Sequence, residues 1–306
     1  MSSQVNAYSY HRKIHLLALT TAVVTCGLIY AGGLVTTIGA GMIFPDWPLS
    51  NGSFNPSNWW KTPDQREEHG HRMIGAIVGL LSMALTVAIC RADLPAWTKR
   101  FAVCAFAGVI IQGLLGGMRV LLVSVDLAIV HGCIGQIVFC LLVTLVCLTS
   151  RNWLEQPRGH ARSFDLRLCA GLTAIVVAQL IIGALVRHNF AWAAIPTFPL
   201  VDGGLIPKNW NWHVTIHYLH RLGALLISIL VLIVAVRAVR QYRSRARFYA
   251  CLTTALVVLQ VCLGAGIIFS SRQVLVTTSH VLIGALVLAC SLVTTLWVWH
   301  GEAGGE

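Results

Sequence analysis

Four histidines lie in or at the start of apolar segments of the chain: His71, His131, His220 and His280. Within a membrane span the cost of removing an ionisable side chain from water is high, so its presence there indicates a function. Neutral imidazole is a ligand of iron, zinc and copper. The four histidines therefore predict metal chemistry inside apolar helices, although they do not by themselves name the metal.

The spacing of these histidines indicates an internal repeat. His71 and His131 are 60 positions apart, His220 and His280 are separated by the same 60 positions, and the two pairs are related by an offset of 149. Further matches at nearly the same offset are Gln112 with Gln260, Gly116 with Gly264, and the segment 45–49 with 196–200. Because the offsets drift by only two or three residues, they predict a duplicated four-helix unit.

The elements that must position the histidines are long apolar segments. Hydrophobic residues make up 57% of the chain and charged residues only 11%, whereas soluble proteins are about 25% charged. A run of about 20 apolar residues crosses a bilayer. Eight such windows lie near 15–38, 70–91, 99–120, 126–149, 167–187, 213–236, 247–269 and 275–299.

These windows predict an all-α integral membrane protein. Its eight transmembrane helices should form two tandem four-helix bundles, 1–150 and 151–306, with outer loops at 39–69 and 188–212. Each unit has an even number of spans, so both units enter the membrane from the same side and the repeats should be parallel. In each bundle, side chains from facing helices can meet inside.

The charge distribution predicts the topology. The chain has 22 Lys and Arg against 11 Asp and Glu, a net charge of +11. Fourteen of the 22 lie in the N-terminal segment and in the connections 91–100, 151–167 and 237–247, which places both termini in the cytoplasm. The four histidines then form one layer near the outer face. No basic run is interleaved with exposed aromatics, so a nucleic-acid partner is not expected.

Two axial histidines in each unit favour haem. A flat macrocycle suits an apolar bundle core, and its iron needs no carboxylate or thiolate ligand. Arg72 and Arg221 directly follow His71 and His220, and a guanidinium can bind a haem propionate through two hydrogen bonds. The alternative for both is an arginine that reaches the lipid headgroups. Arg119 and Arg272, at other outer helix ends, have the same two interpretations with less support.

The two halves differ at Glu68. This acid lies three residues before His71, whereas His217 lies three residues before His220. Positions i and i+3 share a helix face, so we expect Glu68 to point toward the same cavity as His71. A carboxylate held there can transfer protons; the alternative is an interfacial acid paired with a nearby arginine or with water. The difference predicts one reactive site and one supporting site.

Taken together, the chain resembles the haem A synthase family, membrane enzymes that finish the haem of haem-copper terminal oxidases. The resemblance covers about 15–299 and rests on the eight spans in two repeats. It also rests on these motifs: Glu68-x-x-His71-Arg72, His131, His220-Arg221, His280 and Pro45-Asp46-Trp47-Pro48. Some family members carry a cysteine pair in the outer loops, but 39–69 and 188–212 contain no cysteine, so a redox role of that pair cannot apply to this chain.

The resemblance implies an oxidoreductase that oxidises the C8 methyl group of haem O to a formyl group, giving haem A for terminal oxidase assembly. It implies that His220 and His280 ligate a resident haem b, that His71 and His131 ligate the substrate haem, and that Glu68 is the catalytic acid. It also implies a plasma-membrane location with the haem sites toward the outer face. The partners would be haem O, lipid, a haem O synthase and an electron donor; the oligomeric state stays open.

The main alternative is a di-haem b cytochrome that carries electrons without modifying haem. Electron transfer across the membrane would place one haem near each face, whereas all four histidines lie in one layer and Glu68 has no counterpart. A haem or metal transporter ranks third, because no chain of intramembrane charges crosses the cytoplasmic half.

Overall fold

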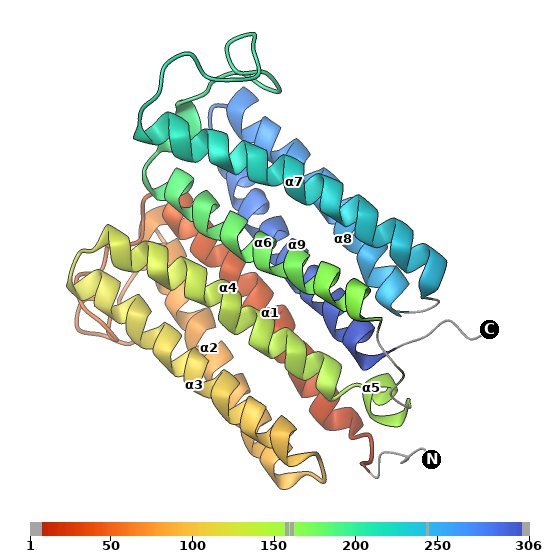
Figure 1. Ribbon diagram of the computed structural model, residues 1–306. Helices are drawn as coiled ribbons and strands as arrows, with labels where there is room; N and C mark the ends of the chain where they lie inside the picture. The colour runs from red at the N-terminus through yellow and green to blue at the C-terminus, as the bar shows by residue number, and fades with distance from the viewer. Residues whose placement is uncertain (1–7, 157–158, 160–161, 243–244, 302–306) are drawn as a thin grey trace. The chain divides into compact units, whose positions relative to one another are not determined.

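The computed structural model describes residues 8–156, 159, 162–242 and 245–301. The chain divides into two compact units, Met1–Pro157 and Arg158–Glu306 (Figure 1). Each unit is built from four long helices.

The N-terminal unit is a closed four-helix bundle. Its long helices are α1 (Arg12–Thr37), α2 (Pro63–Arg91), α3 (Ala96–Leu121) and α4 (Val125–Leu148), followed by the short α5 (Arg151–Glu155). Each long helix packs on the next in the chain, and α4 packs back on α1. The helices α2 and α4 therefore face each other across the ring, and so do α1 and α3.

The C-terminal unit has the same plan. Its helices are α6 (Ser163–His188), the 3-10 helix η1 (Ala191–Ala193), α7 (Trp212–Gln241), α8 (Arg245–Phe269) and α9 (Val274–His300). Again each long helix packs on the next, and α9 closes the ring against α6. This order matches that of α1 to α4 and is consistent with the predicted duplication.

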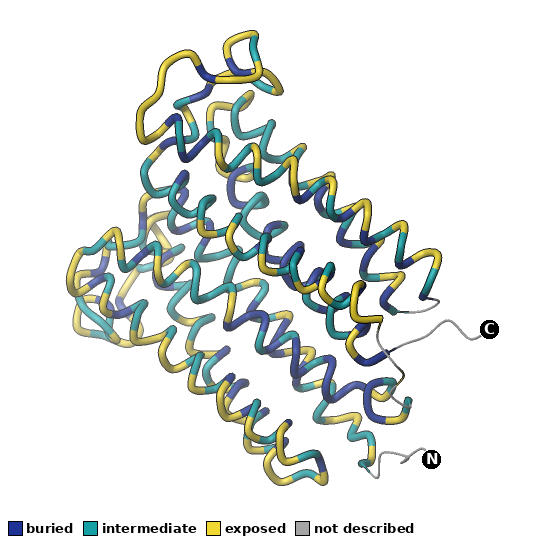
Figure 2. Tube along the Cα trace, viewed as in Figure 1, coloured by how far each residue is buried: buried dark blue, intermediate teal, exposed yellow. Residues whose placement is uncertain are grey.

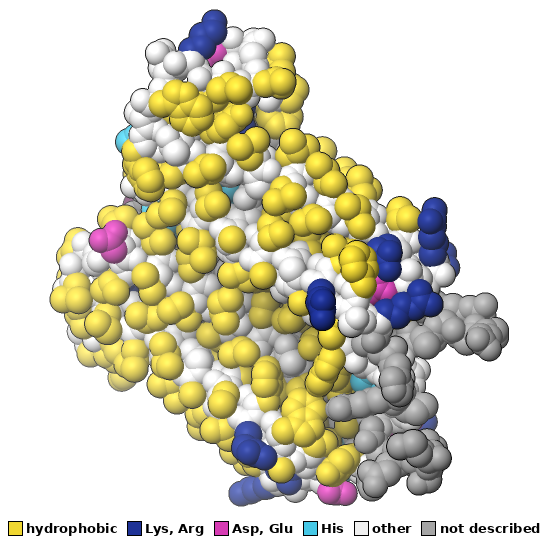
Figure 3. Space-filling model, viewed as in Figure 1, with side chains coloured by type: hydrophobic (Ala, Val, Ile, Leu, Met, Phe, Trp, Pro, Cys, Tyr) yellow, Lys and Arg dark blue, Asp and Glu magenta, His cyan; other side chains and the backbone are white. Residues whose placement is uncertain are grey.

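All eight long helices have the length and composition needed to cross a membrane. The prediction of an all-α membrane protein with eight spans is therefore confirmed. Large apolar side chains are exposed on the outer sides of the helices, among them Leu80, Leu225 and Val258. Figure 2 shows exposed residues recurring along the helices, and in Figure 3 hydrophobic side chains cover their sides. Since so large an apolar surface is unfavourable in water, it is suited to lipid.

The second helix begins earlier than the predicted window at 70. Helix α2 starts at Pro63, with Asp64 in its first turn. Proline fits the first helical position, since its missing N–H has no partner there in any case, and an acid in the first turn favours the positive end of the helix dipole. As a result Glu68 is well inside a regular helix and its side chain has a defined direction.

Below the histidine layer the N-terminal unit is tightly packed. Leu85, Ile89, Ala102, Leu142 and Leu145 belong to one buried apolar cluster. They come from the second halves of α2 and α4 and the first half of α3. This packed end holds the helices together, while the opposite end of the bundle carries the histidines and the outer loop.

The outer loops of the two units have matching turns. A β-bridge joins Ser50 to Ser53 in the first loop and Val201 to Gly204 in the second. Each turn contains a glycine with positive φ, Gly52 at 74° and Gly203 at 81°, a conformation that side chains with a Cβ rarely adopt. The loops thus keep one backbone plan although most of their side chains differ.

Candidate functional site

The four histidines lie at corresponding depths in their helices. His71 and His220 are the ninth residues of α2 and α7, and His131 and His280 are the seventh residues of α4 and α9. Each pair comes from two helices that face each other across a ring. The structure therefore brings together, within each unit, the two histidines that the sequence pairs.

Each histidine ring rests against a glycine of the preceding helix. A Cβ atom added at Gly32 would lie 2.9 Å from Cε1 of His71, and one added at Gly183 would lie 3.0 Å from Cε1 of His220. The corresponding distances are 3.1 Å from Gly116 to His131 and 3.3 Å from Gly264 to His280. These glycines, which we call the seat glycines, let the imidazoles lie where any larger residue would displace them.

A second set of residues lies one helical turn before three of the seat glycines. Gln112 precedes Gly116 by four positions, as Gln179 precedes Gly183 and Gln260 precedes Gly264. Gln112 Nε2 donates to the backbone oxygen of His131 at 2.6 Å, and Gln179 Nε2 donates to that of His220 at 2.7 Å. These amides link neighbouring helices at the level of the histidines.

Within the C-terminal unit, the rings of His220 and His280 are 6.4 Å apart between centroids, with an interplanar angle of 64°. Gln179 Nε2 also lies 3.1 Å from Nδ1 of His220. In the N-terminal unit, His71 and His131 are close enough to interact electrostatically. Of the four paired histidines, His71, His131 and His280 have a buried Nδ1 without a hydrogen-bond partner among the described residues.

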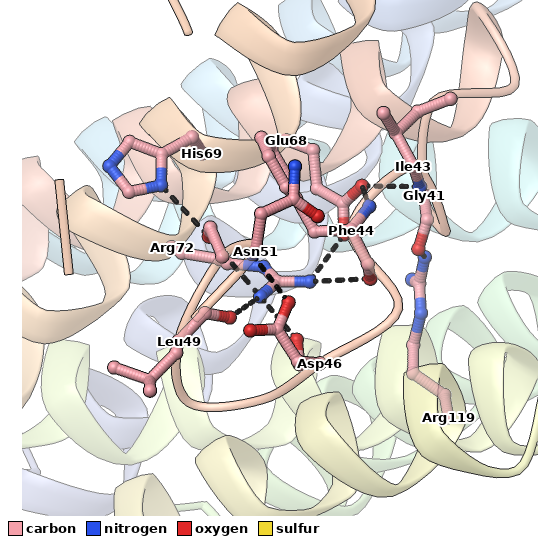
Figure 4. Close-up of polar contacts among 11 residues, drawn as sticks. Gly41, Ile43, Phe44, Asp46, Leu49, Asn51, Glu68, His69, Arg72 and Arg119 are labelled. Carbon is pink, nitrogen blue, oxygen red and sulfur yellow. Dashed lines mark hydrogen bonds and ion pairs between the residues drawn. The ribbon is translucent and has the colours of Figure 1, made fainter. Parts of the chain in front are cut away.

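Glu68 lies in a polar cluster under the first outer loop (Figure 4). Its Oε2 accepts hydrogen bonds from the backbone N–H groups of Ile43 at 2.7 Å and Phe44 at 3.1 Å. Its Oε1 pairs with Arg72 Nη2 at 2.7 Å, and both side chains are largely buried. Glu68 is thus an ion-paired carboxylate that holds the loop, the contact expected from the alternative of an acid paired with a nearby arginine.

Arg72 anchors the same loop. Its Nη1 donates to the carbonyl oxygens of Asp46 at 2.7 Å and Leu49 at 2.6 Å, and its Nη2 donates to that of Phe44 at 3.2 Å as well as to Glu68. The terminal N–H groups of this guanidinium are therefore engaged by the protein itself. The two roles predicted for Arg72, contact with propionates or with headgroups, stay predictions.

Arg221, the counterpart of Arg72, has fewer hydrogen-bond partners than Arg72 among the described residues. Its Nη2 donates to the carbonyl oxygen of Ile195 at 2.9 Å and its Nε lies 3.4 Å from Nε2 of His217. Its Nη1 is buried without a hydrogen-bond partner among the described residues. Because His217 replaces Glu68, the C-terminal unit lacks the carboxylate that completes the cluster in the N-terminal unit.

Arg119, at the end of α3, is more closely involved in the N-terminal site than the sequence suggested. Its Nη2 donates to the carbonyl oxygen of Gly41 at 2.8 Å, and its buried Nε has no partner in the described part of the chain. The guanidinium interacts electrostatically with Glu68 and with both histidines of this unit. An arginine between a carboxylate and two imidazoles can hold an anionic group there.

The sequence analysis did not single out His69. This buried residue lies 3.0 Å from Ser50 Oγ through its Nδ1 and stacks near Trp59, with ring centroids 4.8 Å apart. Tyr218 occupies the corresponding position of the C-terminal unit and donates to the carbonyl oxygen of Leu205 at 3.1 Å. Both residues tie the second helix to its outer loop, and the alignment of the repeats could have indicated this shared role.

Asp46 shapes the tip of the first loop, outside the membrane span. Its two carboxylate oxygens accept the backbone N–H groups of Gly52 and Asn51, each at 2.7 Å. These hydrogen bonds, that of Gly52 first, hold the pKa of Asp46 below its usual value. In the corresponding turn Thr197 Oγ1 accepts the N–H of Asp202 at 3.0 Å, so a hydroxyl replaces the carboxylate.

The cysteines take no part in these sites. All ten are free thiols. Among the described residues, no group of three or more His, Cys, Asp or Glu side chains is placed to hold a metal ion. The donor sets that the structure offers are the two histidine pairs.

Fold and site together define a class: a polytopic membrane protein with paired histidines near one end of each helical bundle. A family model described as cytochrome oxidase assembly protein (COX15-CtaA) matches residues 63–292. Since this match spans most of the chain, the protein belongs to that family, which confirms the resemblance drawn from the motifs.

Curated relatives extend the similarity beyond the matched segment. The Heme A synthase of Geobacillus kaustophilus (strain HTA426) is 30% identical over 279 residues, which cover 88% of this chain and 86% of the relative. The Heme A synthase of Bacillus cereus (strain 03BB102) is 29% identical over 286 residues and covers 88% of both chains. That of Bacillus cereus (strain G9842) is 28% identical over 315 residues, covering 96% of this chain and 97% of the relative.

Proposed function

We propose that this protein is a haem A synthase, an oxidoreductase that converts the C8 methyl group of haem O into a formyl group. Family membership supports the role in cytochrome oxidase assembly, and the names of the relatives support the reaction. The observation that carries the proposal is the repeated pairing of buried histidines, each against a seat glycine, beside a buried carboxylate in one unit alone.

The histidine pairs fit haem. The rings of His220 and His280 lie with their centroids 6.4 Å apart, so both imidazoles could ligate one haem iron. The backbone of Leu28 lies near the ring of His71, that of Gln112 near the ring of His131 and that of Gln260 near the ring of His280. A carbonyl beside the second nitrogen is the usual way to orient a metal-bound imidazole.

We assign His220 and His280 to a resident haem b, and His71 and His131 to the substrate haem. The bound haem b would supply one-electron chemistry, which protein side chains lack. The assignment of units follows from Glu68, because the reacting methyl group must lie where a buried acid can act. The other buried acid among the described residues is Asp165, at the start of α6 and hence at the opposite end of its bundle from His220.

Glu68 would take up or release a proton at its carboxylate during the oxidation. Its Oε2 is held by two backbone N–H groups and its Oε1 by Arg72, so the group is oriented before substrate arrives. Such preorganisation is what makes a side chain effective in proton transfer. Because these contacts include the loop, a movement of 43–50 would change the surroundings of the carboxylate.

The arginines differ in what they can offer a propionate. Arg221 has a buried Nη1 without a partner, so we retain it as a propionate contact in the C-terminal unit. Arg72 is engaged by the loop, and it could bind a propionate only if the loop moved. Arg119, whose Nε is free and buried, is the better candidate in the N-terminal unit.

We further propose the plasma-membrane orientation that the charge distribution indicates, with both termini in the cytoplasm and both histidine pairs toward the outer face. Haem O would come from a haem O synthase, and a separate electron carrier would complete the reaction.

Coexpression with a haem O synthase tests the function. Chromatography of the extracted haems should show haem A with the wild-type protein, and much less with Glu68→Ala. The matched control is Glu67→Ala, since Glu67 is the adjacent acid and its ion-pair partner among the described residues is Arg66. If haem b alone is recovered while haem O is present in the cells, the di-haem b cytochrome becomes the better interpretation.

A further inference from the structure

Three of the four histidine sites have a glutamine near the histidine, and the site of His71 does not. In α3, α6 and α8 the seat glycine is preceded four positions earlier by Gln112, Gln179 or Gln260. In α1 the residue four positions before Gly32 is Leu28. The site of His71 is thus the one of the four whose preceding helix offers no side-chain amide.

The glutamines fit into gaps left by glycines on the histidine helices. A Cβ added at Gly135 would lie 2.8 Å from Gln112 Nε2, and one added at Gly284 would lie 3.1 Å from Gln260 Nε2. At Gly223 an added Cβ would overlap the amide of Gln179. Each glycine lies three or four positions after its histidine, and through this gap Gln112 and Gln179 reach the backbone oxygens of His131 and His220.

Helix α2 keeps the gap but not the amide. Gly75 lies four positions after His71, as Gly135 does after His131. A Cβ added at Gly75 would meet only Cδ1 of Leu28, at the ordinary contact distance of 3.9 Å. Leu28 therefore covers the gap with an apolar contact where the other three sites place a glutamine.

We propose that Leu28 makes His71 the weakly held member of the four ligands, so that the N-terminal unit exchanges its haem while the C-terminal unit retains its own. The inference rests on the proposed function, because it concerns how firmly the two haems are bound. It adds a structural cause for their difference. A glutamine amide lies against the ligand-bearing helix at three sites, and at two of these it donates a hydrogen bond to the histidine backbone. At the fourth site, beside His71, Leu28 replaces the amide.

A weakly held ligand suits a haem that is exchanged in every catalytic cycle. The substrate haem must enter and the product haem must leave, so at least one histidine has to dissociate readily from the iron. An interhelical hydrogen bond in a membrane contributes enough to change a dissociation rate by about three- to fifteenfold. Omitting it beside His71 weakens one ligand without removing the imidazole that binds the iron.

Haem transfer to apomyoglobin measures this difference directly. The purified full-length protein in nanodiscs is loaded with haem b and mixed with an excess of the scavenger, and the loss of haem is followed by absorbance. We expect two phases, of which the faster is missing in His71→Ala. Leu28→Gln should slow the fast phase about three- to fifteenfold, whereas Leu28→Met, which has a similar length and no N–H donor, should leave it unchanged.

Variants that remove an existing amide provide a second test, which can be used if Leu28→Gln does not fold. Gln179→Leu should speed the slow phase, and Gln112→Leu should speed the fast phase further. Unchanged rates in these two variants, with haem bound at both sites, would overturn the inference but leave the proposed function intact. A protein that binds no haem in the N-terminal unit, so that His71→Ala removes no phase, would overturn both.

Discussion

The N-terminal and C-terminal units share a backbone plan but differ in the polar groups at its outer end. Both have a closed ring of four helices, two histidines against seat glycines, and an outer loop with the same turn. Under the first loop, Glu68 and Arg72 form an ion pair that also binds the loop backbone. Under the second, His217 replaces the acid, and Nη1 of Arg221 has no hydrogen-bond partner in the described part of the chain. The duplicated scaffold thus places a buried carboxylate at this position of one unit and a buried imidazole at the same position of the other.

The units differ again at the opposite end. In the C-terminal unit, buried Asp165 accepts from Arg237 Nε at 2.6 Å and from the hydroxyl of Tyr242 at 3.2 Å. Burial and the nearby carboxylate raise the pKa of Tyr242 to about 12. The positions equivalent to Asp165 and Arg237 in the N-terminal unit carry the apolar residues Ile14 and Ala88, and that of Tyr242 carries Asp93. The Asp165–Arg237 ion pair therefore has no counterpart at these positions of the N-terminal unit.

The largest expected effect tests the assignment of the resident haem. Replacing His220 or His280 by Ala should remove that haem, since a single imidazole leaves the iron without its second axial ligand. Pyridine haemochrome analysis of the purified protein measures this loss. His71→Ala serves as the comparison, and equal loss of haem b in all three variants would contradict the division of roles between the units.

The next largest effect concerns the acid. Glu68→Gln should lower haem A formation by about 10²- to 10⁴-fold, the usual contribution of a general acid or base, while haem b stays bound. Chromatographic quantification of haem A against total haem in cells checks it. His217→Ala in the other unit is the matched substitution; a comparable loss there would show that the asymmetry at this position does not separate reactive from supporting sites.

The seat glycines should matter equally in both units. Gly183→Val places a Cβ within about 3 Å of the His220 ring, and such overpacking costs about 1–3 kcal/mol, so haem occupancy should fall severalfold or more. Gly171→Val, on the same helix with nothing within 4 Å of the added Cβ, is the control. Gly32→Val against Gly27→Val repeats the test on α1, and haem content per protein is the measurement in each case.

A smaller effect is expected at the inner end of the C-terminal unit. Asp165→Ala leaves Arg237 and Tyr242 without their shared acceptor, and removing such a buried partner costs about 1–3 kcal/mol. The temperature of unfolding in detergent should fall while the spectrum of bound haem stays unchanged. A changed haem spectrum would show that this end of the bundle is coupled to the histidines.

The smallest effect is expected at the loop turn. The folded pKa of Asp46 is lowered, so its hydrogen bonds stabilise the loop above the unfolded pKa of the carboxyl and are lost as the pH falls through the folded pKa. Asp46→Asn should therefore increase cleavage of the loop by a protease at neutral pH. Thr197→Val in the second loop provides the comparison, because its hydroxyl has no such pH dependence in the acid range.

Much of this molecule could be predicted from sequence because it depends on local composition or on periodicity. Helix α9 was recognised from its run of apolar residues, and His280 from its fixed offset to His131. The start of α2 at Pro63 was missed because the first turn of that helix is polar, so hydropathy does not mark it. A nearby arginine was one expected partner of Glu68, and Arg72 takes that place, whereas Ile43 and Phe44 were missed because they contribute only backbone atoms.

By itself, the sequence determined that this is a membrane protein with eight spans, and that four histidines recur in two pairs. Both properties can be counted along a single chain. Only the tertiary structure decided that Arg72 holds the outer loop, that each imidazole rests on a glycine, and that Leu28 stands where the other sites have an amide. These features depend on which helices pack against each other and on contacts made by backbone atoms. Neither can be derived from the order of side-chain types along the chain.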